Sequence, residues 1–133
     1  IRGIGWVTRR AYVALATDET TASATYATLL TTTIATSLER GYLVIQFSVS
    51  GAQITNVASE SFQVVVDTVP IKAAYTSSPV NYAFSVSMVV RTAVTRGSHT
   101  VLLQWKTSAA TARISALTVL EEHAAMSVHE EAA

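Results

Sequence analysis

The chain has 133 residues, with nine basic and nine acidic side chains and no Cys, and half of its residues are hydrophobic. A chain of this length can bury one core without a metal or a disulfide, and the lack of Cys excludes disulfide scaffolds and thiolate metal sites. Balanced charge removes the uniform positive field that non-specific nucleic-acid binding requires. We therefore expect one domain over residues 1–133 and no nucleic-acid partner.

The surface is expected to be poor in charge. Only 14% of the residues are charged, and the mean hydropathy is +0.36, which is typical of a protein whose surface is partly covered by a partner. No apolar run approaches the roughly 20 residues that span a bilayer, so we expect no membrane partner. The chain opens with Ile1 and not with Met, as expected of a processed, trimmed or partial chain.

The N-terminal third is expected to be extended. Thr, Val and Ser, with 19, 17 and 14 copies, give the chain a strand-forming composition. Residues 1–25 are expected to form an arm and a first strand, the latter over 12–16, with a polar loop over 17–20. The Thr-rich segment 26–36 predicts a strand in which Leu29 and Ile34 point inward; a disordered or glycosylated tract is the alternative for 20–36.

Alternation with a period of two dominates the rest of the chain and predicts a core. It is clearest over 42–50, and it continues over 62–66, 82–90 and 99–106, with a further strand over 71–75. Turns are expected at 39–41, 77–79 and 96–98, where Gly, Ser and Pro separate apolar runs. Residues 99–106 and 112–120 predict a hairpin. The expected core residues are Leu43, Ile45, Phe47, Val64, Val66, Phe84, Val86, Val101, Leu103 and Trp105.

The C-terminal segment 121–133 is expected to be a last strand or a tail. Residues 124–129 alternate as a strand, although residues 120–128 also contain apolar residues at helix-like spacing. The whole pattern has about eight or nine strands separated by short turns. It predicts an all-β fold, an antiparallel two-sheet sandwich of jelly-roll type.

Residues for catalysis or metal binding are few. His123 and His129 lie six apart, which does not match a helical metal pair, and we expect them to be exposed or at an edge. Asp67 could serve as a base, but an aspartate at a strand end usually caps a turn. No nucleophile elbow, phosphate loop, dinucleotide fingerprint or calcium loop is present. We expect no enzyme activity, no cofactor and no metal site.

Binding sites are harder to exclude. The scattered residues Arg9, Arg10, Arg91, Arg96, Lys106 and Arg113 fit edge charges that prevent aggregation, or an anion or glycan site. Trp105 has the phase of a core residue, and Trp6 could cover the sandwich or dock on a neighbouring chain. Candidate ligand contacts are Tyr75, Arg96, Ser98 and His99. Candidate oligomer contacts are Trp6, Val65, Val89, Leu102, Leu117 and Val119.

One segment resembles a known family. Residues 96–108, Arg-Gly-Ser-His-Thr-Val-Leu-Leu-Gln-Trp-Lys-Thr-Ser, followed by Thr111-Ala-Arg-Ile114, resemble the penultimate hairpin of small jelly-roll domains in phage and prophage virion proteins. Residues 43–50 and 62–69 are similar to other strands of that family, so the likeness covers roughly 26–129. The loop 108–110 lacks the glycines of the family, and the tail after Leu120 is unusually rich in Ala and Glu.

The resemblance implies a structural or receptor-contacting role on a phage particle. Such domains are similar in architecture to the trimeric jelly rolls of the tumour necrosis factor and complement globular-head type. The expected function is a non-enzymatic virion component, a capsid decoration protein or a fibre or tail domain, that works as a homotrimer on the particle surface with other virion proteins such as capsid or fibre. The alternative is a carbohydrate- or receptor-binding sandwich that contacts a host-surface glycan.

Overall fold

The computed structural model describes residues 9–53, 58–78, 83–108, 111–117 and 119–133. These residues form an all-β fold, and every strand pairing is antiparallel. The strands are β1 (Arg10–Ala14), β2 (Glu19–Thr21), β3 (Ala27–Gln53), β4 (Ala58–Val66), β5 (Val69–Ser78), β6 (Ala83–Thr107), β7 (Ala112–Ile114) and β8 (His123–Ala132). The predicted fold class, an antiparallel sandwich of about eight strands, is confirmed.

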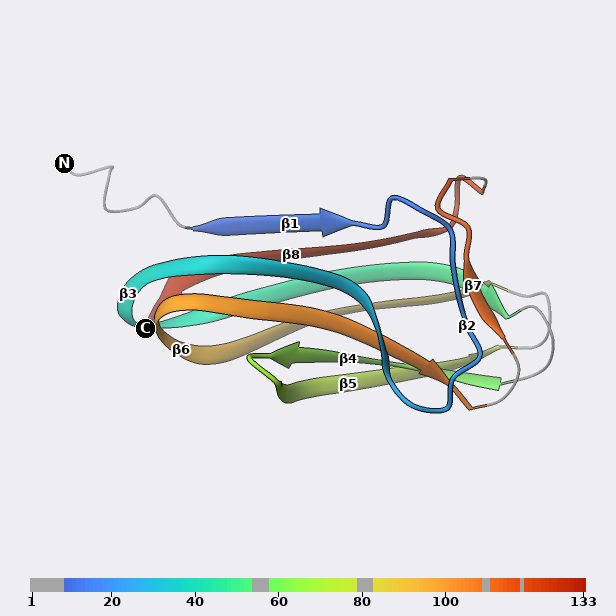
Figure 1. Ribbon diagram of the computed structural model, residues 1–133, viewed down its shortest axis with the longest axis horizontal. Coiled ribbons are helices and arrows are strands. Elements are labelled where there is room, and N and C mark those ends of the chain that lie inside the picture. The colour runs from blue at the N-terminus through green and yellow to red at the C-terminus, as the bar shows by residue number, and fades with distance from the viewer. Residues whose placement is uncertain (1–8, 54–57, 79–82, 109–110, 118) are drawn as a thin grey trace.

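Two long strands build both layers of the sandwich. β3 and β6 pair along almost their whole length, and Figure 1 shows them curving together at one end of the molecule and running back. The register shifts between Thr36 and Arg40, so that β3 residues 27–36 pair with 97–105 and residues 40–52 pair with 83–95. Strands that switch layers through such a bulge make the corners of sandwiches. We call this bend the corner.

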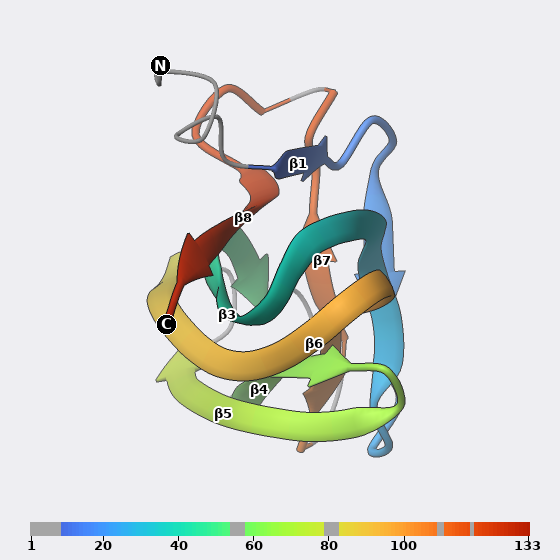
Figure 2. The ribbon, with the colours of Figure 1, turned by 90° about the vertical axis from the view of Figure 1, so that its left-hand side faces the viewer.

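The other strands extend the two layers. The first layer has the order β1, β8, the second half of β3, and the first half of β6; the second has the first half of β3, the second half of β6, β4 and β5. β7 pairs with β2 and with the end of β3. Seen from the corner in Figure 2, the chain curves around one shared interior.

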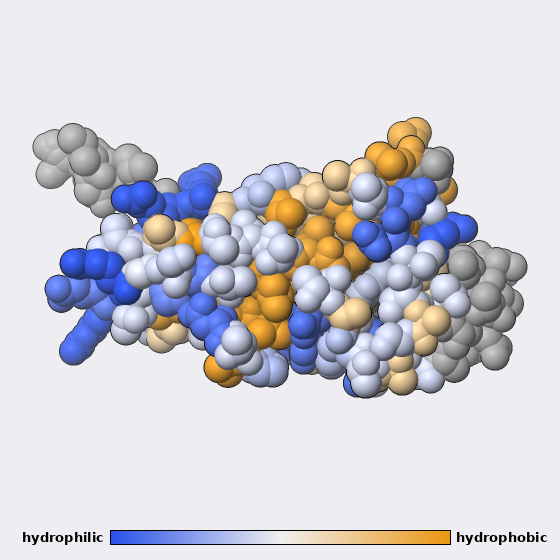
Figure 3. Space-filling model, viewed as in Figure 1, coloured by the Kyte–Doolittle hydropathy of each residue, from blue (hydrophilic) through white to orange (hydrophobic). Residues whose placement is uncertain are grey.

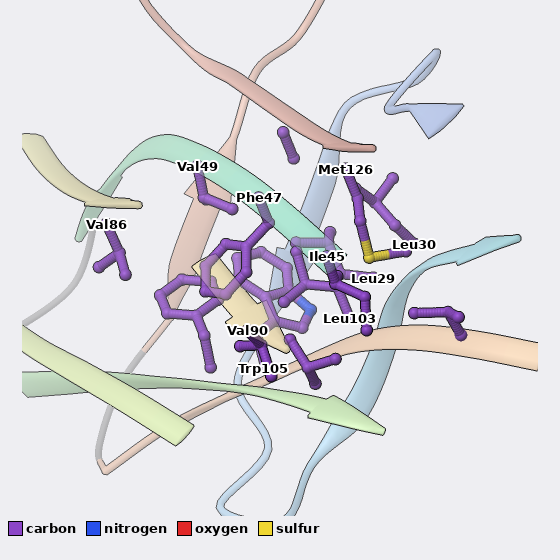
Figure 4. Packing of buried hydrophobic residues seen from close by; sticks show 14 of the residues in the cluster. Leu29, Leu30, Ile45, Phe47, Val49, Val86, Val90, Leu103, Trp105 and Met126 are labelled. Atoms are coloured by element: carbon purple, nitrogen blue, oxygen red, sulfur yellow. The ribbon is translucent and has the colours of Figure 1, made fainter. Parts of the chain in front are cut away.

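The interior holds every core residue that the alternation predicts. Phe62 lies at its centre, with ring centroids 6.4 Å from Phe47, 6.0 Å from Phe84 and 6.4 Å from Trp105. Figure 4 shows Phe47 from one layer and Trp105 from the other pointing into the same interior. Leu29 and Ile34 are buried, as predicted for the Thr-rich segment. Tilted aromatic rings at these separations add to the free energy gained from burial alone.

Several predicted boundaries are wrong. Residues 39–41 and 96–98 are not turns between separate strands; they lie inside β3 and β6, at the corner, where Gly97 takes a φ of +140° that suits glycine at the bend. Residues 99–106 do not form a hairpin with 112–120. Both edges of that part of β6 are already occupied by β3 and β4, so β7 pairs elsewhere and ends at Ile114. The C-terminal segment is a strand and not a helix.

Truncation at the centre of the aromatic cluster should be costly. We expect Phe62→Ala to lower the free energy of unfolding by about 3–5 kcal/mol, through lost burial and the cavity left behind. Chemical denaturation monitored by tryptophan fluorescence measures this. The control is Tyr12→Ala, since Tyr12 is 70% exposed, and its expected cost is below about 1 kcal/mol. Equal losses in the two variants would contradict the central place of Phe62.

Candidate functional site

The outer face of the first layer carries a shallow groove of about 490 Å³. Its lining has no charged side chain and consists of Tyr12, Gln46, Phe47, Ser48, Ser87, Met88, Val89, Ala125, Met126 and Ser127. An adjoining hollow of about 470 Å³ shares Tyr12, Gln46 and Ser127 with the groove and adds Arg10 and His129 at its border. The groove therefore offers hydroxyl, amide and aromatic groups beside a basic margin.

The strand register explains how these side chains come together. Tyr12, Ser127, Gln46 and Val89 are consecutive partners across β1, β8, β3 and β6, so they form one row on the outer face. The next row in the same phase contains small residues only, namely Ala14, Ala125, Ser48 and Ser87. A row of small side chains beside a row with Tyr and Val leaves a hollow. Tyr12 and Gln46 were not among the predicted contact residues, although both have the outer phase of their strands.

The corner holds a second cluster, centred on His99. Its Nδ1 contacts Asp67 Oδ2 at 2.5 Å, and its Nε2 contacts the Thr95 carbonyl oxygen at 2.7 Å. Asp67 also accepts a hydrogen bond from the Thr100 N–H at 2.9 Å through Oδ1, and its own N–H donates to the Thr100 carbonyl. The cluster thus ties the bend of β6 to the turn between β4 and β5.

Both members of the pair favour their charged forms. Burial of the His99 ring opposes its charge, but the hydrogen bonds to Asp67 and to the Thr95 carbonyl, together with the carboxylate charge, raise the pKa of His99 above its usual 6.5. Partial burial likewise opposes the charge of Asp67, but the hydrogen bonds from His99 and the Thr100 N–H, with the charge on His99, lower the pKa of Asp67 below its usual 3.8. At a pH between the two shifted pKa values the pair is therefore an imidazolium and a carboxylate.

The pair is arranged to hold structure. The His99 ring is 8% exposed, and both of its nitrogens face an acceptor within the chain. A general base needs a free nitrogen within reach of substrate. Asp67 and Thr68 have φ values of 49° and 72° and make the tight turn between β4 and β5, so Asp67 is a turn residue, the alternative that the sequence favours.

Buried carboxylates stabilise both ends of β8. Glu130, 2% exposed, accepts hydrogen bonds from the Ser37 N–H at 2.9 Å, the Leu38 N–H at 2.8 Å and the Ser37 hydroxyl, all in the bulge of β3. Glu122, 8% exposed, pairs with Arg113 at 2.7 Å and accepts from the Ser115 N–H. Neither role was predicted from the sequence. A signal exists for Glu130, which has the inward phase of Met126 and Val128.

The predicted oligomer contacts do not form one surface. Val89 is 60% exposed on the first layer, Leu102 is half-buried on the outer face of the second layer, and Leu117 and Val119 lie between β7 and β8. Val65 is only 5% exposed, because Leu102 and Pro70 flank it on the neighbouring strands. Its prediction as an exposed contact is wrong. Trp6 lies outside the described residues.

The predicted ligand contacts are also separated. Arg96 is exposed, pairs with Glu39 at 3.5 Å and donates to the Ser37 carbonyl. Ser98 is exposed nearby, but the buried ring of His99 is not available to a ligand. Tyr75 pairs with Ser61 far along the sheet from the corner, and its side chain lies outside the described part of the structure. These four residues therefore do not make one site.

Comparison with protein families and with curated proteins found no match. No protein-family model matches the chain, and no curated protein matches its sequence. In the described part of the chain no helix is long and apolar enough to cross a membrane. The described residues also contain no group of three or more His, Asp or Glu side chains placed to hold a metal ion.

Removal of the Glu130 carboxylate should weaken the corner. We expect Glu130→Ala to cost about 2–3 kcal/mol of unfolding free energy, since a charged acceptor is lost to two backbone N–H groups and a hydroxyl. The matched control is Glu131→Ala on the same strand. Glu131 is half-exposed and pairs with Arg91, so its expected cost is below about 1 kcal/mol. Urea unfolding of both variants at neutral pH makes the comparison, and a smaller loss for Glu130→Ala would contradict the assignment.

Proposed function

We propose that this protein is a non-enzymatic structural component of a phage particle, a capsid decoration protein or a fibre or tail domain, and that it works as a homo-oligomer on the particle surface. The particle assignment comes from the resemblance of residues 96–114 to virion jelly rolls. The observation that supports self-association is the scarcity of charge combined with apolar groups on the outer faces of both layers. A small domain with such a surface is dispersed poorly unless a partner covers it.

The placement of the apolar groups favours a ring over a two-fold dimer. Val89 lies on the outer face of the first layer, and Leu102 lies on the outer face of the second. On the face drawn in Figure 3, hydrophobic residues gather in the middle and again at the upper right, and hydrophilic groups lie on either side of the middle group. A two-fold interface uses one patch twice, whereas a cyclic oligomer joins two different patches of each chain. The proposed assembly is a trimer that joins these two patches.

The proposal is tested by charge placed in each patch. The wild-type chain is expected to sediment as a stable oligomer of its 14.2 kDa protomer, and Val89→Asp and Leu102→Asp are each expected to dissociate it, because an unpaired charge in an apolar interface costs several kcal/mol. The control is Ala35→Asp, an exposed strand residue close to the corner. Circular dichroism checks that each variant is folded.

Mixing the two variants separates a ring from a two-fold dimer. In a ring, each variant keeps one intact patch, so the mixture is expected to form a complex of one chain of each, although neither variant associates alone. A two-fold interface at one patch would leave one variant fully assembled. A wild-type chain that sediments as a monomer at every concentration would exclude the proposed assembly.

The groove supports a second candidate, a carbohydrate-binding role at a host surface. Tyr12 is 70% exposed beside the floor made by Gln46, Ser48, Ser87 and Ser127, and an aromatic face with amide and hydroxyl groups suits an uncharged saccharide.

Tyr12 provides the test of this second role. On a glycan array, Tyr12→Ala is expected to lose at least about tenfold in binding, corresponding to one stacking contact of roughly 1.4 kcal/mol. Tyr12→Phe should retain most of it, since the ring face remains. Binding unaffected by Tyr12→Ala, or no glycan bound at all by the wild type, would exclude the groove as a saccharide site.

A further inference from the structure

The corner is held by a histidine whose two ring nitrogens both face acceptors. Nδ1 faces the Asp67 carboxylate, and Nε2 faces the Thr95 carbonyl, which lies four residues earlier in β6. A carbonyl oxygen can only accept, and an ionised carboxylate can only accept. Both contacts are therefore hydrogen bonds only when the ring carries two N–H groups, that is, when it is an imidazolium.

We propose that His99 is a proton-controlled clamp, which in its imidazolium form ties the bend of β6 to the β4–β5 turn and which loosens this tie when the ring loses a proton. A neutral imidazole has one N–H group. Whichever nitrogen keeps the proton, the other turns a lone pair toward an oxygen, so one of the two contacts becomes repulsive. A 180° rotation of the ring puts Cδ2 and Cε1 in the places of the two nitrogens, so it gives up both hydrogen bonds and does not restore either of them.

The loss of either contact acts on the corner. The Thr95 carbonyl accepts a hydrogen bond from the Thr36 hydroxyl at 3.0 Å, and that hydroxyl accepts one from the Gly97 N–H at 3.1 Å. The carbonyl that Nε2 contacts is therefore part of the hydrogen bonding that joins β3 to β6 at the corner. The Asp67 contact leads to the β4–β5 turn, which remains attached through the backbone hydrogen bond that the Asp67 N–H donates to the Thr100 carbonyl. We therefore expect local loosening of the corner and not global unfolding.

Other charged groups near the corner are engaged with other partners, and the charged group that contacts His99 is Asp67. On β6 itself, Arg96 pairs with Glu39 of β3. On β8, Glu130 is engaged by the Ser37 and Leu38 N–H groups. On the β4–β5 turn, Asp67 contacts the ring directly, and its side chain is 47% exposed. Solvent protons therefore have a route to the pair through the exposed side of Asp67.

The direction of the pH effect follows from the two pKa shifts. Because the pKa of His99 is raised in the folded chain, its contribution to stability is complete below the usual 6.5 and is lost as the pH rises through the folded value. Because the pKa of Asp67 is lowered, its contribution is present above 3.8 and is lost as the pH falls through the folded value. The clamp is closed between these limits, and it opens on the alkaline side.

The experiment follows the ring and the corner in the intact chain. Nitrogen-15 NMR of the imidazoles should show His99 with both nitrogens protonated at pH 6.5 and a titration midpoint above that of free histidine. Hydrogen exchange, corrected for the intrinsic rate, should show the protection of the Thr100 amide falling several-fold between pH 5.5 and 8.5. The urea midpoint should fall over the same range.

Two variants and one control assign these effects. His99→Gln is expected to lose the decrease in protection of the Thr100 amide between pH 5.5 and 8.5, whereas His123→Gln, at an exposed site on β8 where Nε2 contacts the Ser48 hydroxyl, should retain it. Asp67→Asn keeps an acceptor for the Thr100 N–H but removes the charge, so the titration midpoint of His99 should fall.

Two results would overturn the clamp: a His99 midpoint at or below that of free histidine, or an unchanged pH response in His99→Gln. If His99→Gln does not fold, the ring titration of the wild type and of Asp67→Asn decides the question. In that case a midpoint that Asp67→Asn does not lower excludes the proposal.

Discussion

The shared bend of β3 and β6 is the constraint on which the rest of this structure depends. Because the same two strands supply the middle of both layers, the register shift between Thr36 and Arg40 fixes how the layers face each other and which side chains meet in the interior. Polar contacts from several strands stabilise this bend. The Thr36 hydroxyl bridges to β6, and the buried carboxylate of Glu130 holds the bulge from β8. An outward displacement at this point would separate the two halves of the aromatic cluster, so packing and corner geometry stabilise each other.

The surface is poor in free charge. Several ionised groups are engaged within the fold, as in the pairs Arg113–Glu122, Arg91–Glu131 and His99–Asp67. Arg91 also lies over the Tyr42 ring, 3.7 Å from its centroid, which favours a fixed position for that guanidinium. Between these pairs the outer faces present hydroxyls, small side chains and single apolar groups. A surface of this kind is open to association with another copy or with an uncharged ligand. Val89 belongs both to the proposed interface and to the lining of the groove, so the two proposed roles are alternatives at this face.

The core could be predicted from the sequence because a period of two is a local property. Leu43, Ile45 and Phe47 have the same phase whichever strand they pair with. Strand pairing is not a local property, and the predicted pairing is wrong. The predicted hairpin pairs 99–106 with 112–120 because these segments are neighbours in the sequence. In the structure, β3 and β4 occupy both edges of that part of β6. At Gly97 the sequence correctly indicates a residue with a positive φ, but the predicted end of a strand is wrong. A positive φ is compatible with a bend inside a strand as well as with a turn between two strands. Val65 is a second example. The alternation predicts which face of the sheet it lies on, but it does not predict that residues on the neighbouring strands bury its side chain.

The corner cluster lay beyond sequence reasoning for a related reason. Asp67 and His99 are separated by 32 residues, and each is unremarkable alone, a turn aspartate and a single histidine. Only the bend brings them into contact, because it places the start of the second half of β6 against the turn that ends β4. The ring then meets a carboxylate on one side and a main-chain carbonyl on the other, and this geometry selects its protonation state. A titratable group can thus acquire its role from the tertiary fold alone, so the chemistry of this chain lies in how its strands bend and not in a motif along them.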